Sequence, residues 1–149
     1  LYYLVQQPVM DFSYYNTHIH GITATDVKNM PTFPSIWAEI KGYLNNNIVL
    51  AHNASFDMSV LKSILNTYNL EKPNFKYYCT VSLAKKVWPE LENHKLNTLA
   101  SYFNINFKHH NALHDSKVCA MVAVLATRKL NSKNFAQLIT KLNLKDNKF

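Results

Sequence analysis

Hydrophobic positions along this chain form short continuous runs and longer stripes at helical spacing. The clearest run is Ile48–Ala51, four apolar residues typical of a strand that is buried on both faces. His52 and Asn53 follow directly, so they are expected at the carboxyl end of that strand, with Asn53 as the N-cap of a helix. The expected buried stripe of this helix consists of Phe56, Val60, Leu61, Ile64, Leu65 and Tyr68.

The same reasoning places further elements along the chain. Two more strands are predicted, at Leu1–Gln6 and Lys76–Cys79. Helices are predicted at 33–44, 80–87, 96–103 and 113–129, with shorter ones after Thr23 and after Ser132. Strands that alternate with helices in this way predict an α/β fold with at least some parallel pairing.

Two acidic residues each open a predicted apolar helical face. Asp57 lies three residues before Val60, and Asp115 lies three residues before Val118. Taken singly, each is an ordinary first-turn acid favoured by the helix dipole. Two carboxylates that both point inward, in a chain with nine acidic residues, instead favour a shared divalent cation.

Length and composition narrow the class of protein. The 149 residues suit one soluble domain, and they contain neither an apolar stretch long enough to cross a membrane nor a signal-peptide pattern. Cys79 and Cys119 lie in apolar segments, as buried free thiols do, which indicates a reducing, cytoplasmic location. The formal charge of +7 suits a polyanionic partner, but the lysines are dispersed and most are expected to be solvated.

Histidines near Asp115 add candidate chemistry. His110 lies five positions before Asp115 on a predicted loop, where a neutral imidazole could take a proton from a reacting water. His109 is the alternative base. A zinc site built from His109, His110 and His114 is the less favoured alternative, because no Glu base and no Cys accompany them. His18, His52 and His94 are each expected to be surface or hydrogen-bonded residues.

Two segments resemble a known family. AHNASFD at 51–57 and HHNALHDS at 109–116 closely resemble the second and third motifs of the DnaQ-like 3′–5′ exonucleases that carry a catalytic histidine. Supporting similarity to DNA polymerase III epsilon-type proteins comes from IHGIT at 19–23, CTVSLAKKVWPEL at 79–91 and HKLNTLA at 94–100. The resemblance covers nearly all of residues 1–130.

This resemblance implies a ribonuclease H-like mixed sheet flanked by helices, with an exonuclease domain at 1–130 and a C-terminal helix and tail at 131–149. It implies two divalent cations, Mg²⁺ or Mn²⁺, with Asp57 and Asp115 as their ligands and His110 as the general base. The implied substrate is a single-stranded DNA 3′ end or a nucleotide monophosphate, and a DNA polymerase subunit is a further expected partner. The residues expected to bind the terminal nucleotide are His20, Gly21, Ile22, Asn53 and Phe56.

One family feature is missing from the 149 residues. Members carry an Asp-x-Glu first motif on a strand, whereas Asp11 is followed by Phe12 and Ser13. Since LYYLVQQP resembles the family's third strand, we expect the first motif and two strands to precede Leu1. The alternative function is therefore a catalytically incomplete nucleic-acid-binding module of the same fold.

Overall fold

A small mixed sheet forms the centre of the computed structural model, which describes residues 1–9, 11–107 and 110–149. Its strands lie in the order β1 (Ile48–Ala51), β2 (Lys76–Cys79) and β3 (Asn147–Lys148). β1 and β2 are parallel, whereas β3 is antiparallel to β2. The predicted strands at 48–51 and 76–79 and their parallel pairing are thus confirmed.

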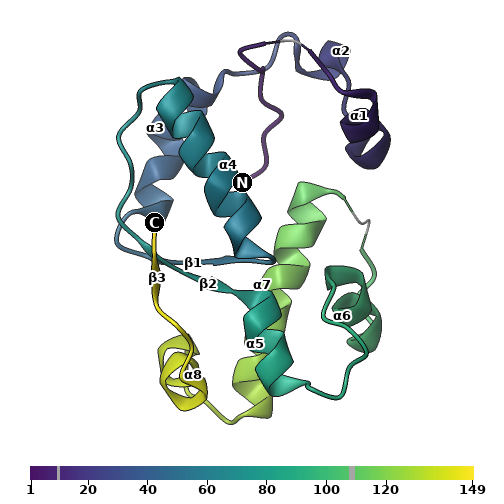
Figure 1. Cartoon of the computed structure of the whole chain (residues 1–149), viewed down its shortest axis with the longest axis vertical. Coiled ribbons are helices and arrows are strands. Elements are labelled where there is room, and N and C mark those ends of the chain that lie inside the picture. The colour runs from purple at the N-terminus through teal and green to yellow at the C-terminus, as the bar shows by residue number, and fades with distance from the viewer. Residues whose placement is uncertain (10, 108–109) are drawn as a thin grey trace.

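Helices cover both sides of the central strands. In Figure 1, α3 and α4 lie on one side of β1 and β2, and α5, α7 and α8 lie on the other, while α1 and α2 lie at an outer end of the molecule. The helices span α1 Tyr14–His20, α2 Ala24–Val27, α3 Phe33–Leu44, α4 Ala54–Thr67, α5 Thr80–Val87, α6 Leu96–Tyr102, α7 Ala112–Lys129 and α8 Phe135–Leu142.

The largest apolar core lies where α5, α7 and α8 pack together on β2. Leu83, Val122 and Leu138, one from each helix, are at most 1% exposed. Leu144, which follows α8, belongs to the same cluster. The terminal helix therefore contributes to the main core, and a domain boundary after residue 130 stays a prediction.

The predicted strand at Leu1–Gln6 is wrong. Within the described chain, this segment makes one isolated parallel bridge, between Gln6 and Thr32, through a 3.0 Å hydrogen bond from the Gln6 N–H to the Pro31 carbonyl. Apolar residues such as Leu1 and Tyr2 are exposed. An apolar run becomes a strand only when its backbone has a pairing partner.

The predicted buried face of α4 is only partly right. Leu65 is fully buried, but Phe56 is 66% exposed and Val60 is 51% exposed, while Ala54 and Met58 are buried in their place. The helix is rotated so that the stripe at 54, 58 and 65 faces the strands. Asp57 consequently lies beside the buried face and is exposed, not inward as predicted.

The predicted N-caps of the helices are confirmed at some helices and wrong at others. Thr23 and Asp26 form the predicted capping box, in which the Thr23 N–H donates to the Asp26 carboxylate at 2.8 Å. The predicted Ser132 cap is wrong, because Asn134 caps α8 by accepting the Gln137 N–H at 2.9 Å. The backbone of Asn53 at the start of α4 is left-handed, and its side chain makes no cap hydrogen bond.

Within the described ranges, none of the helices combines the length and the apolar character that a membrane crossing requires.

Candidate active site

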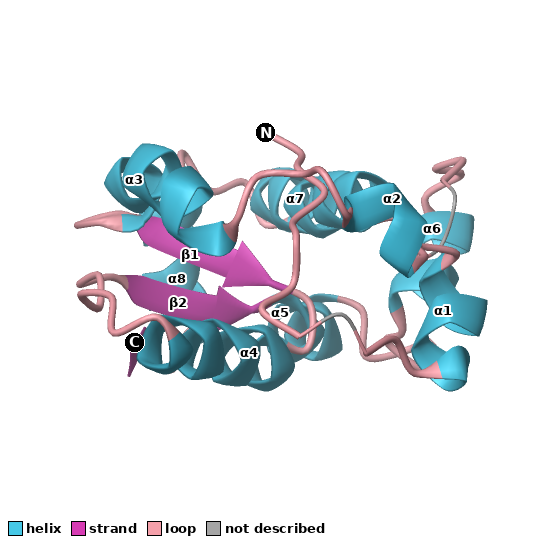
Figure 2. Ribbon diagram, turned by 90° about the horizontal axis from the view of Figure 1, so that it is seen from above, coloured by secondary structure: helices cyan, strands magenta, loops and turns pink. Residues whose placement is uncertain are grey.

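A cavity of about 1150 Å³ opens at the carboxyl ends of the parallel strands, where ligands bind in open α/β sheets. Ala51 and His52 at the end of β1 lie at its wall, together with Cys119 of α7. Figure 2 shows both arrowheads pointing toward the same end of the molecule, where the first turns of α4 and α5 begin. The predicted residues that line this cavity are Asn53, Phe56, Asp57, His110 and Asp115.

Asp57 and Asp115 enter the cavity from two different helices. Each lies in the first turn of its helix, α4 for Asp57 and α7 for Asp115. Burial raises the pKa of the Cys119 thiol, and the negative charge of Asp57 raises it further. Cys119 follows Asp115 by one helical turn on α7, so this effect of Asp57 indicates that the acid of α4 lies near the start of α7.

The electrostatic environment of Asp57 suits a cation. Although the residue as a whole is exposed, partial burial of its carboxylate raises the pKa of Asp57 above its ordinary value, and a hydrogen bond from its own backbone N–H lowers it in part. A positive ion beside such a carboxylate favours its charged form. Two carboxylates are oxygen donors of the kind that Mg²⁺ and Mn²⁺ prefer, so the donor set fits a hard divalent ion.

The three-histidine zinc alternative gains no support. Over the part of the chain that the structure describes, no three His, Cys, Asp or Glu side chains are grouped so that they could hold a metal ion. His109 lies outside the described residues. His110 and His114 are described, and both already interact with other protein groups.

His110 has an unusual backbone. It is exposed, precedes the N-cap Asn111 by one residue and adopts a left-handed conformation with φ of 61°. Residues other than glycine adopt this region rarely, although His and Asn do so more readily than most. Such conformations gather at functional sites, and here one positions an imidazole at the cavity wall.

Sequence reasoning missed the role of His52 in the cavity. Its Nδ1 lies 2.9 Å from Oγ1 of Thr80, a fully buried residue whose hydroxyl also approaches Cys119 Sγ at 3.5 Å. The expectation that His52 would be hydrogen-bonded is confirmed, as it is for His94, which bonds the Trp88 carbonyl at 2.9 Å. The position of His52 at the carboxyl end of a buried strand was the available signal.

His20, Gly21 and Ile22 do not line this cavity. They form the turn between α1 and α2, where the Ile22 N–H donates to His20 Nδ1 at 3.0 Å. Gly21 ends α1 with a φ of 73°, a left-handed conformation that glycine adopts without strain. Their assignment to the terminal nucleotide stays a prediction.

A family described as RNase_T, Exonuclease, matches residues 4–123. The chain is 32% identical over 117 residues to a DNA polymerase III PolC-type protein of Oceanobacillus iheyensis, a match that covers 78% of this chain and 8% of that protein. It is 34% identical over 116 residues to a DNA polymerase III subunit epsilon of Buchnera aphidicola, covering 73% of this chain and 47% of that protein. The chain thus spans less than half the length of these relatives.

A solved structure of exonuclease X in complex with 5′ overhanging duplex DNA has a similar fold. The TM-score is 0.70 with 24% sequence identity, covering 93% of this chain and 78% of that one. This likeness confirms the predicted α/β, ribonuclease H-like class, with a mixed sheet flanked by helices.

Proposed function

The chain belongs to the RNase_T exonuclease family, and from this premise we propose that it acts on DNA as a 3′–5′ exonuclease. The reaction is hydrolysis of the terminal phosphodiester bond, in replication proofreading or in repair. The observation that carries the proposal is that Asp57 lines the same cavity as His110 and Asp115, although more than 50 residues separate it from them in sequence.

Asp57 and Asp115 are the residues that would hold the divalent cations, two Mg²⁺ or Mn²⁺ ions. When bound, such ions stabilise the negative charge that develops on phosphoryl oxygens during hydrolysis. The carboxylates also lie in the first turns of α4 and α7, so both are carried by the ends of helices that open at the cavity. The two helices therefore bring both acids to one cavity.

His110 is the proposed general base. Its exposed imidazole lies at the cavity wall, where a neutral ring nitrogen can accept a proton from the attacking water. The left-handed backbone holds the ring just before α7, so that base and acid reach the cavity from neighbouring positions.

Asn53 and Phe56 are the proposed contacts for the terminal nucleotide. Phe56 presents a 66% exposed ring at the cavity, and nucleotide bases stack well on such aromatic faces. His20, Gly21 and Ile22 are further proposed contacts from the α1–α2 turn. The proposed substrate is a single-stranded DNA 3′ end, and the proposed product is a nucleoside monophosphate. The proposed partner is a DNA polymerase subunit, and the proposed location is the cytoplasm.

A nucleic-acid-binding module of the same fold is the second candidate. The 149 residues contain no Asp-x-Glu pair, so Asp57 and Asp115 supply fewer oxygen ligands than two divalent ions require. Under this second candidate, a chain limited to these ligands binds 3′ ends and does not hydrolyse them.

End-labelled single-stranded DNA tests the reaction and its direction. With Mn²⁺, a 5′-labelled strand should shorten stepwise through a ladder of products, whereas a 3′-labelled strand should release labelled mononucleotide at once. Asp115→Asn should abolish both signals. Release of mononucleotide first from the 5′ end, or activity that persists in Asp115→Asn, would contradict the proposal, and binding without any shortening would favour the second candidate.

A further inference from the structure

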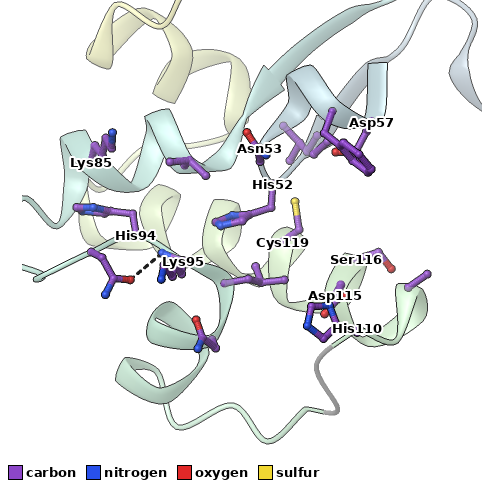
Figure 3. Close-up of a pocket in the computed structure, with 18 of the residues that line it drawn as sticks. His52, Asn53, Asp57, Lys85, His94, Lys95, His110, Asp115, Ser116 and Cys119 are labelled. Atoms are coloured by element: carbon purple, nitrogen blue, oxygen red, sulfur yellow. Dashed lines mark hydrogen bonds between the residues drawn. The ribbon is translucent and has the colours of Figure 1, made fainter. Parts of the chain in front are cut away.

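The cavity extends well beyond the two acids. In the view of Figure 3, His52 lies between the labelled Asp57 and Asp115 on one side and Lys85 and Lys95 on the other. Lys85 projects from α5, and Lys95 immediately precedes α6. Both lysines line the same cavity as the acids. One cavity therefore has an acidic end and an end that carries two ammonium groups.

Both ammonium groups are available to a ligand. Lys85 and Lys95 are exposed, and within the described residues neither forms an ion pair with an acidic side chain. Other lysines with acids nearby do form such pairs, for example Lys41 with Glu71. Unpaired ammonium groups beside a cavity attract phosphate, because a lysine offers phosphate oxygens up to three donors and a full charge.

The segment that carries Lys95 is held in place by side chains. The Lys95 N–H donates to Asn93 Oδ1 at 3.1 Å, and the Thr98 hydroxyl donates to the same oxygen at 2.7 Å. His94 Nε2 donates to the Trp88 carbonyl at 2.9 Å, since a carbonyl can only accept. These bonds fix the approach to α6 before a ligand arrives, which reduces the entropy that binding would cost.

The size of the cavity exceeds what one nucleotide requires. Pockets for molecules of drug size, comparable to a nucleotide, have volumes of roughly 300 to 1000 Å³. The volume here is about 1150 Å³, and the lysines lie beyond His52 from the acids. A ligand that occupied both ends of the cavity would place its reacting group at the acids and further negative charge at the lysines.

We propose that Lys85 and Lys95 form a subsite for an internucleotide phosphate of single-stranded DNA whose 3′ end lies at Asp57 and Asp115. The inference rests on the proposed function and deepens it, because it sets the path of the strand and makes the binding unit at least a dinucleotide. The strand runs from the acids past His52 toward α5 and α6.

Glu92 lines the same end of the cavity as the two lysines and carries the opposite charge. Its carboxylate is exposed and forms no ion pair with either lysine in the described chain. Its charge nevertheless repels a phosphate at this end. Removing this charge and removing the lysine charges must therefore change the affinity in opposite directions.

The test compares binding of thymidine monophosphate with binding of a tetrathymidylate whose phosphorothioate linkages resist hydrolysis, measured by calorimetry over a range of salt concentrations. The wild-type chain should bind the tetramer more tightly than the monophosphate. Lys85→Gln/Lys95→Gln should weaken tetramer binding by about tenfold and reduce the salt slope by about 0.7 per lysine. Monophosphate binding should stay within about twofold, and Glu92→Gln should strengthen tetramer binding.

Lys72→Gln/Lys133→Gln is the matched control, because it removes the same charge from two exposed lysines that do not line the cavity. An equal loss in this control, unchanged tetramer binding in the Lys85/Lys95 variant, or a wild type that binds tetramer and monophosphate equally would each overturn the subsite. A tetramer affinity that depends on the lysines but not on Asp115→Asn would sustain the subsite and contradict the proposed function.

Discussion

His52 and Thr80 are joined by a hydrogen bond of 2.9 Å between Nδ1 and Oγ1, although 28 residues separate them in sequence. Thr80 is fully buried, and its hydroxyl lies 3.5 Å from the Ala51 carbonyl and from Cys119 Sγ. The end of β1, the start of α5 and the first half of α7 thus meet at one hydroxyl group beneath the cavity.

Thr80→Val should disturb this junction while it keeps the side-chain shape. The His52 ring and the Ala51 carbonyl lose a buried partner, so we expect a loss of about 1 to 3 kcal/mol in the free energy of unfolding, measured with urea. The His52 ¹⁵N shifts should also change. Thr80→Ser keeps the hydroxyl and should preserve those shifts, and similar shifts in wild type and Thr80→Val would show that Thr80 does not orient His52.

Stability at low pH should depend on Asp146. Hydrogen bonds from Lys76 and then from Tyr78 lower the pKa of this carboxyl in the folded protein. A carboxyl whose pKa is lower in the folded protein stabilises the fold at pH values above its unfolded pKa of about 4. This stabilisation is lost as the pH falls through the pKa of the folded protein. Asp146→Asn should therefore flatten the decline of urea midpoints between pH 5 and the acid limit, compared with Asp11→Asn.

Tyr78 should make the stability of the fold fall as the pH rises in the alkaline range. Burial, and then its hydrogen bond to Asp146, raise the pKa of Tyr78 from 10.0 to about 12. Stability that depends on the neutral phenol is complete below pH 10 and is lost as the pH rises toward 12. Tyr78→Phe should remove this part of the alkaline decline in the free energy of unfolding. A decline of unchanged steepness would contradict the raised pKa.

Leu138 tests whether α8 is part of the main core. Leu138 is fully buried among the core side chains. Leu138→Ala should therefore lower the free energy of unfolding by about 2 to 5 kcal/mol. Val124→Ala, at a position that is 41% exposed, should change it by less than about 0.5 kcal/mol. Two separate unfolding transitions, with only one shifted by Leu138→Ala, would instead support a boundary after residue 130.

His110→Asn tests the proposed base. Asn tolerates the left-handed backbone of residue 110, so the substitution removes the imidazole without adding strain. Single-turnover hydrolysis should fall by about 10² to 10⁴, with little change in DNA affinity. The rising limb of the pH profile that follows imidazole ionisation should disappear. His109→Ala should reduce turnover only modestly, and a larger loss there would move the assignment to His109.

The sequence predicted the central elements well because their signals are local. Ile48–Ala51 and Lys76–Cys79 are strands with the predicted bounds, and the Thr23 capping box forms as its spacing requires. Helix phase was harder. Phe56 and Val60 have the apolar spacing of a buried stripe, yet α4 turns Met58 and Leu65 toward the core. Periodicity gives several possible faces, and packing against the strands selects one.

The site was predictable only in part for the same reason. Asp57 and Asp115 were singled out because each was expected to point inward at a helix start; Asp57 is exposed instead, yet both line the cavity. Lys85 and Lys95 were not found, because nothing in their separate sequence positions shows that α5 and the approach to α6 meet at one cavity. Contacts between distant segments depend on the tertiary fold, which a single sequence pattern does not encode.

The central claim is that Asp57 and Asp115 hold one divalent-ion site together. Mn²⁺ titration by calorimetry, with Asp57→Asn, Asp115→Asn and the double variant, tests it most directly. Each single variant should weaken Mn²⁺ binding at least about tenfold, and the double variant should lose much less than the sum, because the two carboxylates share one ion. Asp11→Asn, at a residue that does not line the cavity, should bind as wild type does. Mn²⁺ affinity that is unchanged in either single variant, or losses that simply add, would contradict the shared site.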